Sequence, residues 1–175
     1  MKKRIIILIS FLFAININGQ TLEDKWVKVN NEGCEVLDPY YSKGVTETWE
    51  GKCINGKADG YGILKKYSNG ELESIYEGEY KNGIREGKGK FTHIGMNSVL
   101  ECTFANGQAV GKGVYTLNGG HKYVGDIVNF RSHGEGTLYY ASGAKQEGFF
   151  VSDRFYTGKD TEFDGTVTYI QQYYL

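Results

Sequence analysis

The stretch Tyr76-Glu-Gly-Glu-Tyr-Lys-Asn-Gly-Ile-Arg-Glu-Gly-Lys-Gly-Lys-Phe91 decides the fold of this 175-residue chain. In a β-strand, alternate side chains share one face of the sheet. Tyr76, Gly78 and Tyr80 therefore point one way, while the glutamates and the lysine between them point to water. This pattern predicts a strand with one apolar face on which large and small residues alternate.

The second half of the stretch predicts the turn and the return strand. Asn82-Gly83 suits a tight hairpin turn, because such a turn needs two successive residues at positive φ. The chain then returns through Gly87-x-Gly89-x-Phe91, again with two small residues and one large residue on a face. We expect a ring opposite a glycine to leave a slot in which the ring of the next repeat lies flat over backbone.

The same pattern recurs along the chain at intervals of 27, 24 and 23 residues. Each copy has a large residue, a small residue two positions later, a turn, and then Gly-x-Gly followed by another large residue. One hairpin cannot bury its apolar face alone, whereas stacked neighbours can. The positions that define this core are Trp49, Gly51, Gly60, Gly62, Leu64, Tyr76, Gly78, Gly87, Gly89, Phe91, Gly111, Gly113, Tyr115, Tyr123, Gly125, Gly134, Gly136 and Leu138.

These motifs resemble the MORN (membrane occupation and recognition nexus) repeat family, in a form similar to exported bacterial MORN-like proteins. The copies at 49–70, 76–91 and 123–143 follow the family pattern, and the copy at 100–119 has Leu100 and Cys102 in place of Tyr and Gly. A fifth copy from Gln146 keeps Gly148 and then departs from the pattern. The resemblance implies an all-β fold: an elongated, twisted antiparallel sheet of stacked hairpins without a large helical domain.

The chain divides into four expected parts. Residues 1–19 have the basic start, the apolar run from Ile5 to Ile15 and the short polar end of a secretory signal peptide. Residues 20–48 form an irregular N-terminal cap with a degenerate repeat that starts near Trp26. Residues 49–145 hold four repeats, and residues 146–175 hold the degenerate last repeat and a capping strand. The expected localisation is therefore export to the periplasm or the extracellular space.

Composition and charge argue against a protein of long helices and against a nucleic-acid-binding protein. The chain has 25 glycines, 25 aromatic residues and one proline, which favours short strands and turns over long helices. Removal of residues 1–19 leaves 17 basic residues against 21 acidic ones, a net charge near −4. Nucleic-acid binding needs a cationic surface, so we expect no nucleic-acid partner.

Aromatic residues outside the repeat positions are the candidate binding face, because tyrosine suits contact surfaces. They are Tyr67, Tyr80, Phe104, Tyr139 and Tyr140. The alternative is that the aromatic stripe only forms the core between repeats.

Two of the three cysteines are expected to pair in an exported protein. Cys34 precedes the first good repeat, Cys53 lies on its opening strand, and Cys102 occupies a small inward position. We therefore expect a Cys34–Cys53 disulfide that pins the N-terminal segment to the sheet. Cys102 is then a small buried residue or an intermolecular bridge.

The sequence contains no catalytic constellation. His93, His121 and His133 fall at different phases of the repeat, and the Gly-x-Gly pairs do not open a helix as a phosphate loop does. The run from Asp160 to Gly165 resembles half of a calcium loop but lacks the closing glutamate. No catalytic residue, metal site or cofactor is expected.

Three functional classes remain. The first is a noncatalytic scaffold that binds a protein or pairs with itself through a sheet edge. The second is a membrane-associated module, since the resemblance implies phospholipid binding for some members. The third is an enzyme or an enzyme accessory, which would be called a kinase only by analogy with its family. This class rests only on the fact that such units occur in some lipid-kinase and methyltransferase proteins. The first class is the expected function.

Overall fold

The computed structural model describes residues 25–29 and 33–171, so the expected signal peptide lies outside the described residues. This part of the chain forms one 13-stranded sheet, and its only helical element is a single 3-10 turn at Asn118–Gly120. The strands are β1 (Trp26–Val29), β2 (Cys34–Leu37), β3 (Val45–Ile54), β4 (Lys57–Ser68), β5 (Glu71–Lys81), β6 (Ile84–His93), β7 (Ser98–Ala105), β8 (Gln108–Thr116), β9 (Lys122–Val128), β10 (Arg131–Tyr139), β11 (Lys145–Val151), β12 (Arg154–Thr161) and β13 (Val167–Ile170).

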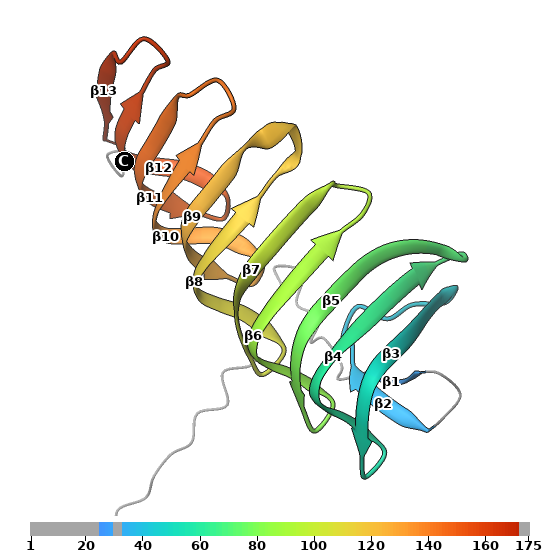
Figure 1. The fold of residues 1–175 in the computed structure, drawn as a ribbon. Helices are drawn as coiled ribbons and strands as arrows, with labels where there is room; N and C mark the ends of the chain where they lie inside the picture. Colours follow the sequence, from blue (N-terminus) through green and yellow to red (C-terminus); the bar gives the residue numbers. More distant parts are fainter. Residues whose placement is uncertain (1–24, 30–32, 172–175) are drawn as a thin grey trace, which may run out of the picture.

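Successive hairpins lie side by side in a long, twisted row that runs from β3 to β13 (Figure 1). Each strand from β4 to β12 pairs antiparallel with the strands before and after it in the sequence. A hairpin needs only a short connection between neighbouring strands, which explains why sequence order and sheet order agree. The expected all-β architecture of stacked hairpins is confirmed.

Each hairpin bends sharply near its glycine pair. In the β5–β6 hairpin the register shifts between Gly78 and Tyr80, and Gly87 has φ 72°, which a residue with a side chain rarely adopts. Beyond the bend the tip folds over, and the Gly83 amide donates a hydrogen bond of 2.8 Å to the Ala58 carbonyl of the preceding hairpin. The tips therefore form a second row that encloses the core.

The N-terminal segment is more regular than its sequence indicates. Residues 26–37, expected as part of an irregular cap, form the β1–β2 hairpin, which pairs over Trp26–Val29 and Cys34–Leu37. This hairpin joins the sheet through one parallel bridge between Glu35 and Lys57. The Leu37 amide also donates a 2.8 Å hydrogen bond to the Gly83 carbonyl at a hairpin tip. The hairpin therefore covers the row of tips at its first end.

Candidate functional site

The glycine pairs accept aromatic rings, as expected, but the ring comes from the same repeat. A Cβ at Gly78 would lie 2.6 Å from Tyr76 Oη, and a Cβ at Gly89 would lie 2.5 Å from the same atom. Both glycines face each other across β5 and β6, so the Tyr76 ring lies flat over two strands of its own hairpin. Trp49 and Tyr123 cover the glycine pairs of their hairpins in the same way. The expectation that the ring of the next repeat fills the slot is therefore corrected.

The next repeat contributes a different side chain, which removes two residues from the candidate binding face. Tyr80 is 2% exposed and Phe104 is 0% exposed, so neither can contact a partner. The Tyr80 ring lies edge-on to Trp49 with 4.8 Å between centroids, and the Phe104 ring lies edge-on to Tyr76 at 4.9 Å. The bend at each glycine pair turns these side chains back onto the ring of the preceding repeat.

From the second repeat on, the buried position lies four residues after the first core position of the repeat, which holds Tyr76, Leu100, Tyr123 or Gln146. The same position holds Ile127 and Phe150 in later repeats, and both are fully buried. In a strand, residues that differ by an even number share a face, so the alternation already placed Tyr80 beside Tyr76. Spacing from the ring is thus the signal that identifies this part of the core.

The remaining three candidates do not share one surface. Tyr67 lies on β4, at a distance of several strands from Tyr139 on β10 (Figure 1). Tyr139 is exposed, whereas Tyr140 is half-buried and its hydroxyl donates a 2.9 Å hydrogen bond to Gln146 Oε1. Tyr67, Tyr139 and Tyr140 therefore do not form a common binding face.

Large exposed side chains gather instead at the C-terminal end of the sheet. Phe163 is 79% exposed and Tyr169 is 76% exposed, and Val167 is also exposed. Val167 and Tyr169 lie on β13, which pairs with β12 on one side and is the last strand of the sheet in the part of the chain that the structure describes. This end presents apolar side chains next to unpaired backbone.

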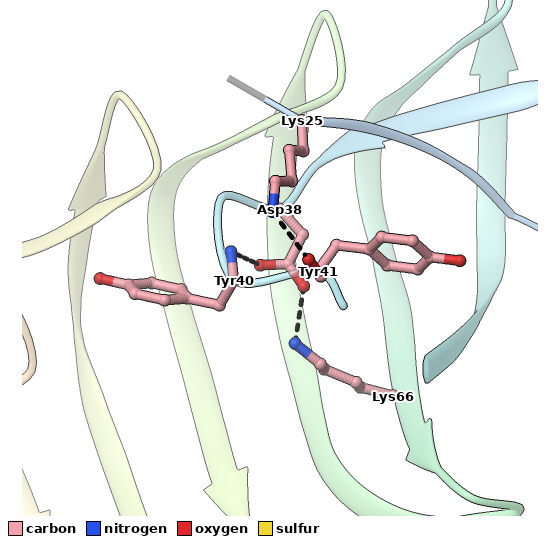
Figure 2. Close-up of polar contacts among 5 residues, drawn as sticks. All are labelled: Lys25, Asp38, Tyr40, Tyr41 and Lys66. Carbon is pink, nitrogen blue, oxygen red and sulfur yellow. Dashed lines mark hydrogen bonds and ion pairs between the residues drawn. The ribbon is translucent and has the colours of Figure 1, made fainter. Parts of the chain in front are cut away.

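A buried polar cluster lies at the opposite end, where the N-terminal segment meets the sheet (Figure 2). Asp38 accepts a 2.7 Å hydrogen bond from Lys66 Nζ on β4 and a 2.9 Å hydrogen bond from the Tyr40 amide. Lys25 Nζ donates to the Tyr41 carbonyl at 3.1 Å, and the Asp38 amide donates to the Lys25 carbonyl at 3.0 Å. These bonds hold the start of the 38–44 segment against the sheet.

The cysteines follow the expected pairing. Cys34 and Cys53 form a disulfide with 5.8 Å between their Cα atoms. Cys53 stands four residues after Trp49, so it occupies the position at which later repeats insert a side chain into the preceding repeat. No repeat precedes the first one in the part of the chain that the structure describes, and the disulfide joins this repeat to the β1–β2 hairpin. Cys102 is a buried free thiol, and burial raises its pKa to about 11.

The histidines and the possible metal ligands are spread over several elements in the residues that the structure describes. No group of three His, Cys, Asp or Glu side chains in residues 25–29 and 33–171 is arranged to hold a metal ion. His93, His121 and His133 lie on β6, in a loop and on β10, as partly exposed residues. Within the same residues, no helix has the length and apolar character needed to cross a membrane.

Comparison with known families agrees with this geometry. The MORN repeat model matches four stretches of the chain, residues 49–71, 76–93, 103–122 and 123–145. The chain is also similar to alsin from Homo sapiens and from Pan troglodytes, with 30% identity to each over 95 residues, and to alsin from Rattus norvegicus, with 27% identity. These alignments cover 52% of this chain and 6% of each alsin, so the chain corresponds to a small part of those proteins.

Proposed function

We propose that this chain is a noncatalytic, exported MORN-repeat scaffold that binds protein through the free β13 edge of its sheet, including a second copy of itself. MORN repeats are commonly involved in interactions with proteins or with membrane lipids. The disulfide between Cys34 and Cys53 suits an oxidising compartment outside the cytosol. The proposal rests on the β13 edge, which has exposed apolar side chains and no charged ones.

The two edges of the sheet differ in how they are protected. An exposed edge strand offers unpaired N–H and C=O groups, and proteins block such edges with charges or with covering segments. The β3 edge carries the exposed charged residues Glu50 and Lys52, and the β1–β2 hairpin is attached to it by the disulfide. Residues 165–171, which include β13, contain no charged side chain. Among the residues that the structure describes, none pairs with the outer side of β13, so this edge suits strand addition better than the β3 edge does.

The side chains of β13 fit a protein partner. Tyr169 lies opposite Lys159 and Val167 lies opposite Thr161 on β12, on the face away from the core. An aromatic residue and a β-branched residue on one face form favourable cross-strand pairs of about 0.2–1 kcal/mol each. A strand added to β13 would therefore gain both backbone hydrogen bonds and apolar contacts.

The lack of charge also suits pairing between two copies. In an antiparallel pair with twofold symmetry, the residue on the axis lies opposite its own equivalent, so a charge at or next to the axis would lie close to a like charge. An antiparallel pair centred on Thr168, the midpoint of residues 165–171, places Val167 of one copy opposite Tyr169 of the other. Like-charge repulsion is then absent along the whole contact.

Light scattering after size-exclusion chromatography tests this proposal. We expect the wild-type protein to be a dimer at concentrations of about 10–100 μM and Thr168→Lys to be a monomer, because two lysines would meet at the axis. Thr46→Lys, an exposed change on β3, is the matched control and should leave the dimer intact. Equal masses for Thr168→Lys and Thr46→Lys would contradict pairing through β13.

Co-sedimentation with anionic vesicles tests the membrane alternative. The scaffold proposal predicts no sedimentation with vesicles of phosphatidylserine and phosphatidylcholine, even at low salt, because the expected net charge of residues 20–175 is near −4. Salt-sensitive sedimentation that persists in Thr168→Lys would assign the chain to lipid binding and would overturn the proposal.

A further inference from the structure

Two buried carboxyl groups compete for one lysine where the N-terminal segment meets the sheet. Glu47 on β3 and Lys66 on β4 are direct cross-strand neighbours, yet Lys66 Nζ bonds to Asp38 Oδ2 at 2.7 Å. Asp38 is 2% exposed and Glu47 is 5% exposed. Neither oxygen of Glu47 accepts a hydrogen bond in the described part of the protein. An ionised Glu47 would therefore be a buried charge without hydrogen bonds, which is costly.

The other groups that face Glu47 do not remove this cost. Arg85 on β6 and Tyr80 on β5 contribute to the electrostatic field at Glu47, but the Arg85 Nε atom and the Tyr80 hydroxyl are buried without hydrogen-bond partners. Further along the same row of paired residues, Ser74 separates Lys66 from His93. The charged groups around Glu47 are thus Asp38, Lys66 and Arg85.

The surroundings of the two carboxyl groups shift their pKa values in opposite directions. Burial first, and then the hydrogen bond and the negative charge of Asp38, raise the pKa of Glu47 to about 8. Burial also acts to raise the pKa of Asp38, but the hydrogen bond and positive charge of Lys66, the hydrogen bond with Glu47 and the Tyr40 amide together lower it. At neutral pH the pair therefore holds one proton, on Glu47, which donates to the ionised Asp38.

We propose that Glu47 is a proton-dependent latch, whose protonated carboxyl holds Asp38 and the 38–44 segment against the inner face of the sheet, and that loss of this proton in mildly alkaline solution releases the segment. The latch would control access to the inner face of β3 and β4 beneath the segment. It acts at the end of the sheet opposite the β13 edge, so it does not depend on the proposed scaffold function.

The pH dependence of segment opening follows from the difference in proton binding between the closed and the open state. In the open segment Glu47 is in water and ionises near its ordinary value of 4.5, whereas in the closed segment it ionises at about 8. Between these two values the closed state holds one more proton, so the opening equilibrium rises about tenfold for each pH unit. Above pH 8 the rise ends, because both states are ionised. Asp38 acts in the opposite direction, and only in acid, where its lowered pKa is reached.

Hydrogen exchange measured by mass spectrometry tests the latch in the full chain with its disulfide intact. Protection factors, which are corrected for the intrinsic pH dependence of exchange, are compared from about pH 5.5 to about pH 9. Residues 38–44 should lose about tenfold protection for each unit up to about pH 8, and β5 and β6 should keep theirs. Glu47→Gln should abolish the pH dependence at 38–44. Glu50→Gln, the same exchange at an exposed position of β3, should leave it unchanged.

Three outcomes would overturn the proposal. One is an equal pH dependence at 38–44 in Glu47→Gln and in the wild-type protein, which would place the proton on another group. Another is a parallel loss of protection in β5 and β6, which would show a change in overall stability and not a local release. The third comes from a direct NMR titration of the Glu47 carboxyl carbon in the wild-type protein, which needs no variant. The latch requires a midpoint near 8, and a midpoint below about 6 would refute it.

Discussion

Replacement of Gly78 by alanine tests the packing of a ring over a glycine pair, which is the repeated feature of this fold. The new Cβ would lie 2.6 Å from Tyr76 Oη, 2.7 Å from Tyr76 Cζ and 2.8 Å from Gly89 Cα. The Gly89 atom belongs to the backbone of the paired strand and cannot rotate away. The tyrosine is also held, because its hydroxyl donates to the Glu79 carbonyl at 3.3 Å. Either β5 and β6 must separate or the ring must leave its position.

These contacts determine the expected loss of stability. Overpacking of a core costs about 1–3 kcal/mol, and the close backbone contact places this site at the upper end of that range. Alanine also restricts the unfolded chain more than glycine does, and this effect offsets the loss of stability by about 0.4–1 kcal/mol. The net loss should therefore be about 2 kcal/mol, or a decrease in Tm of about 4–8 °C for a chain of this size.

Denaturant unfolding of Gly78→Ala and Gly95→Ala measures this difference. Gly95 lies in an exposed turn, and a Cβ there would meet its nearest neighbour, His93, at 3.7 Å, an ordinary contact distance. We expect Gly95→Ala to change stability by less than about 0.5 kcal/mol. In a Tyr76→Leu background the cost of Gly78→Ala should fall by about 1 kcal/mol, since the ring contact is absent. Equal effects of the Gly78 and Gly95 changes would refute the packing argument.

Three further predictions concern the core and the cysteines. Reduction of the Cys34–Cys53 disulfide should lower the free energy of unfolding by about 3 kcal/mol, measured by urea titration with and without reductant. Phe104→Ala should lower it by about 3–5 kcal/mol, whereas Tyr139→Ala on the exposed face should change it by less than about 0.5 kcal/mol in the same titration. Cys102 should resist a soluble thiol reagent at neutral pH until the protein unfolds, because burial raises the pKa of its thiol to about 11 and blocks access.

The local rules for turns predicted part of the fold well. Asn55-Gly56, Asn82-Gly83 and Asn106-Gly107 all have positive φ at both residues, as the expected hairpin turns require. The turns at Asn129-Phe130 and Ser152-Asp153 adopt the same conformation without glycine. Phe130 has φ 64°, and its ring lies 5.3 Å from the Phe91 ring and 5.8 Å from the Phe104 ring between centroids. Packing in the tertiary structure stabilises a conformation that local sequence rules do not predict.

The polar cluster could not be predicted because its members are far apart in the sequence. Asp38 and Lys66 are 28 residues apart, and their contact depends on the path of the 38–44 segment across the sheet. Glu47 looks like an ordinary polar residue of a strand until the register places it opposite Lys66, whose amine bonds to Asp38. Strand alternation can assign Glu47 to a face, but it cannot show that Asp38 already occupies the lysine.

The last repeat differs from the interior repeats at its first core position, and the packing explains this difference. In the interior, a ring is useful because the following repeat inserts a side chain against it, as Phe104 does against Tyr76 and Phe150 does against Tyr123. The equivalent ring position in the last repeat is Gln146, and no following repeat inserts a side chain there among the described residues. Its amide bonds Tyr140 and Asp160 instead, at 2.9 and 3.0 Å. A polar residue at this point ends the apolar core, as a capping repeat must. A partner at β13 is therefore expected to extend the sheet through backbone pairing and outer-face contacts, without continuing the core.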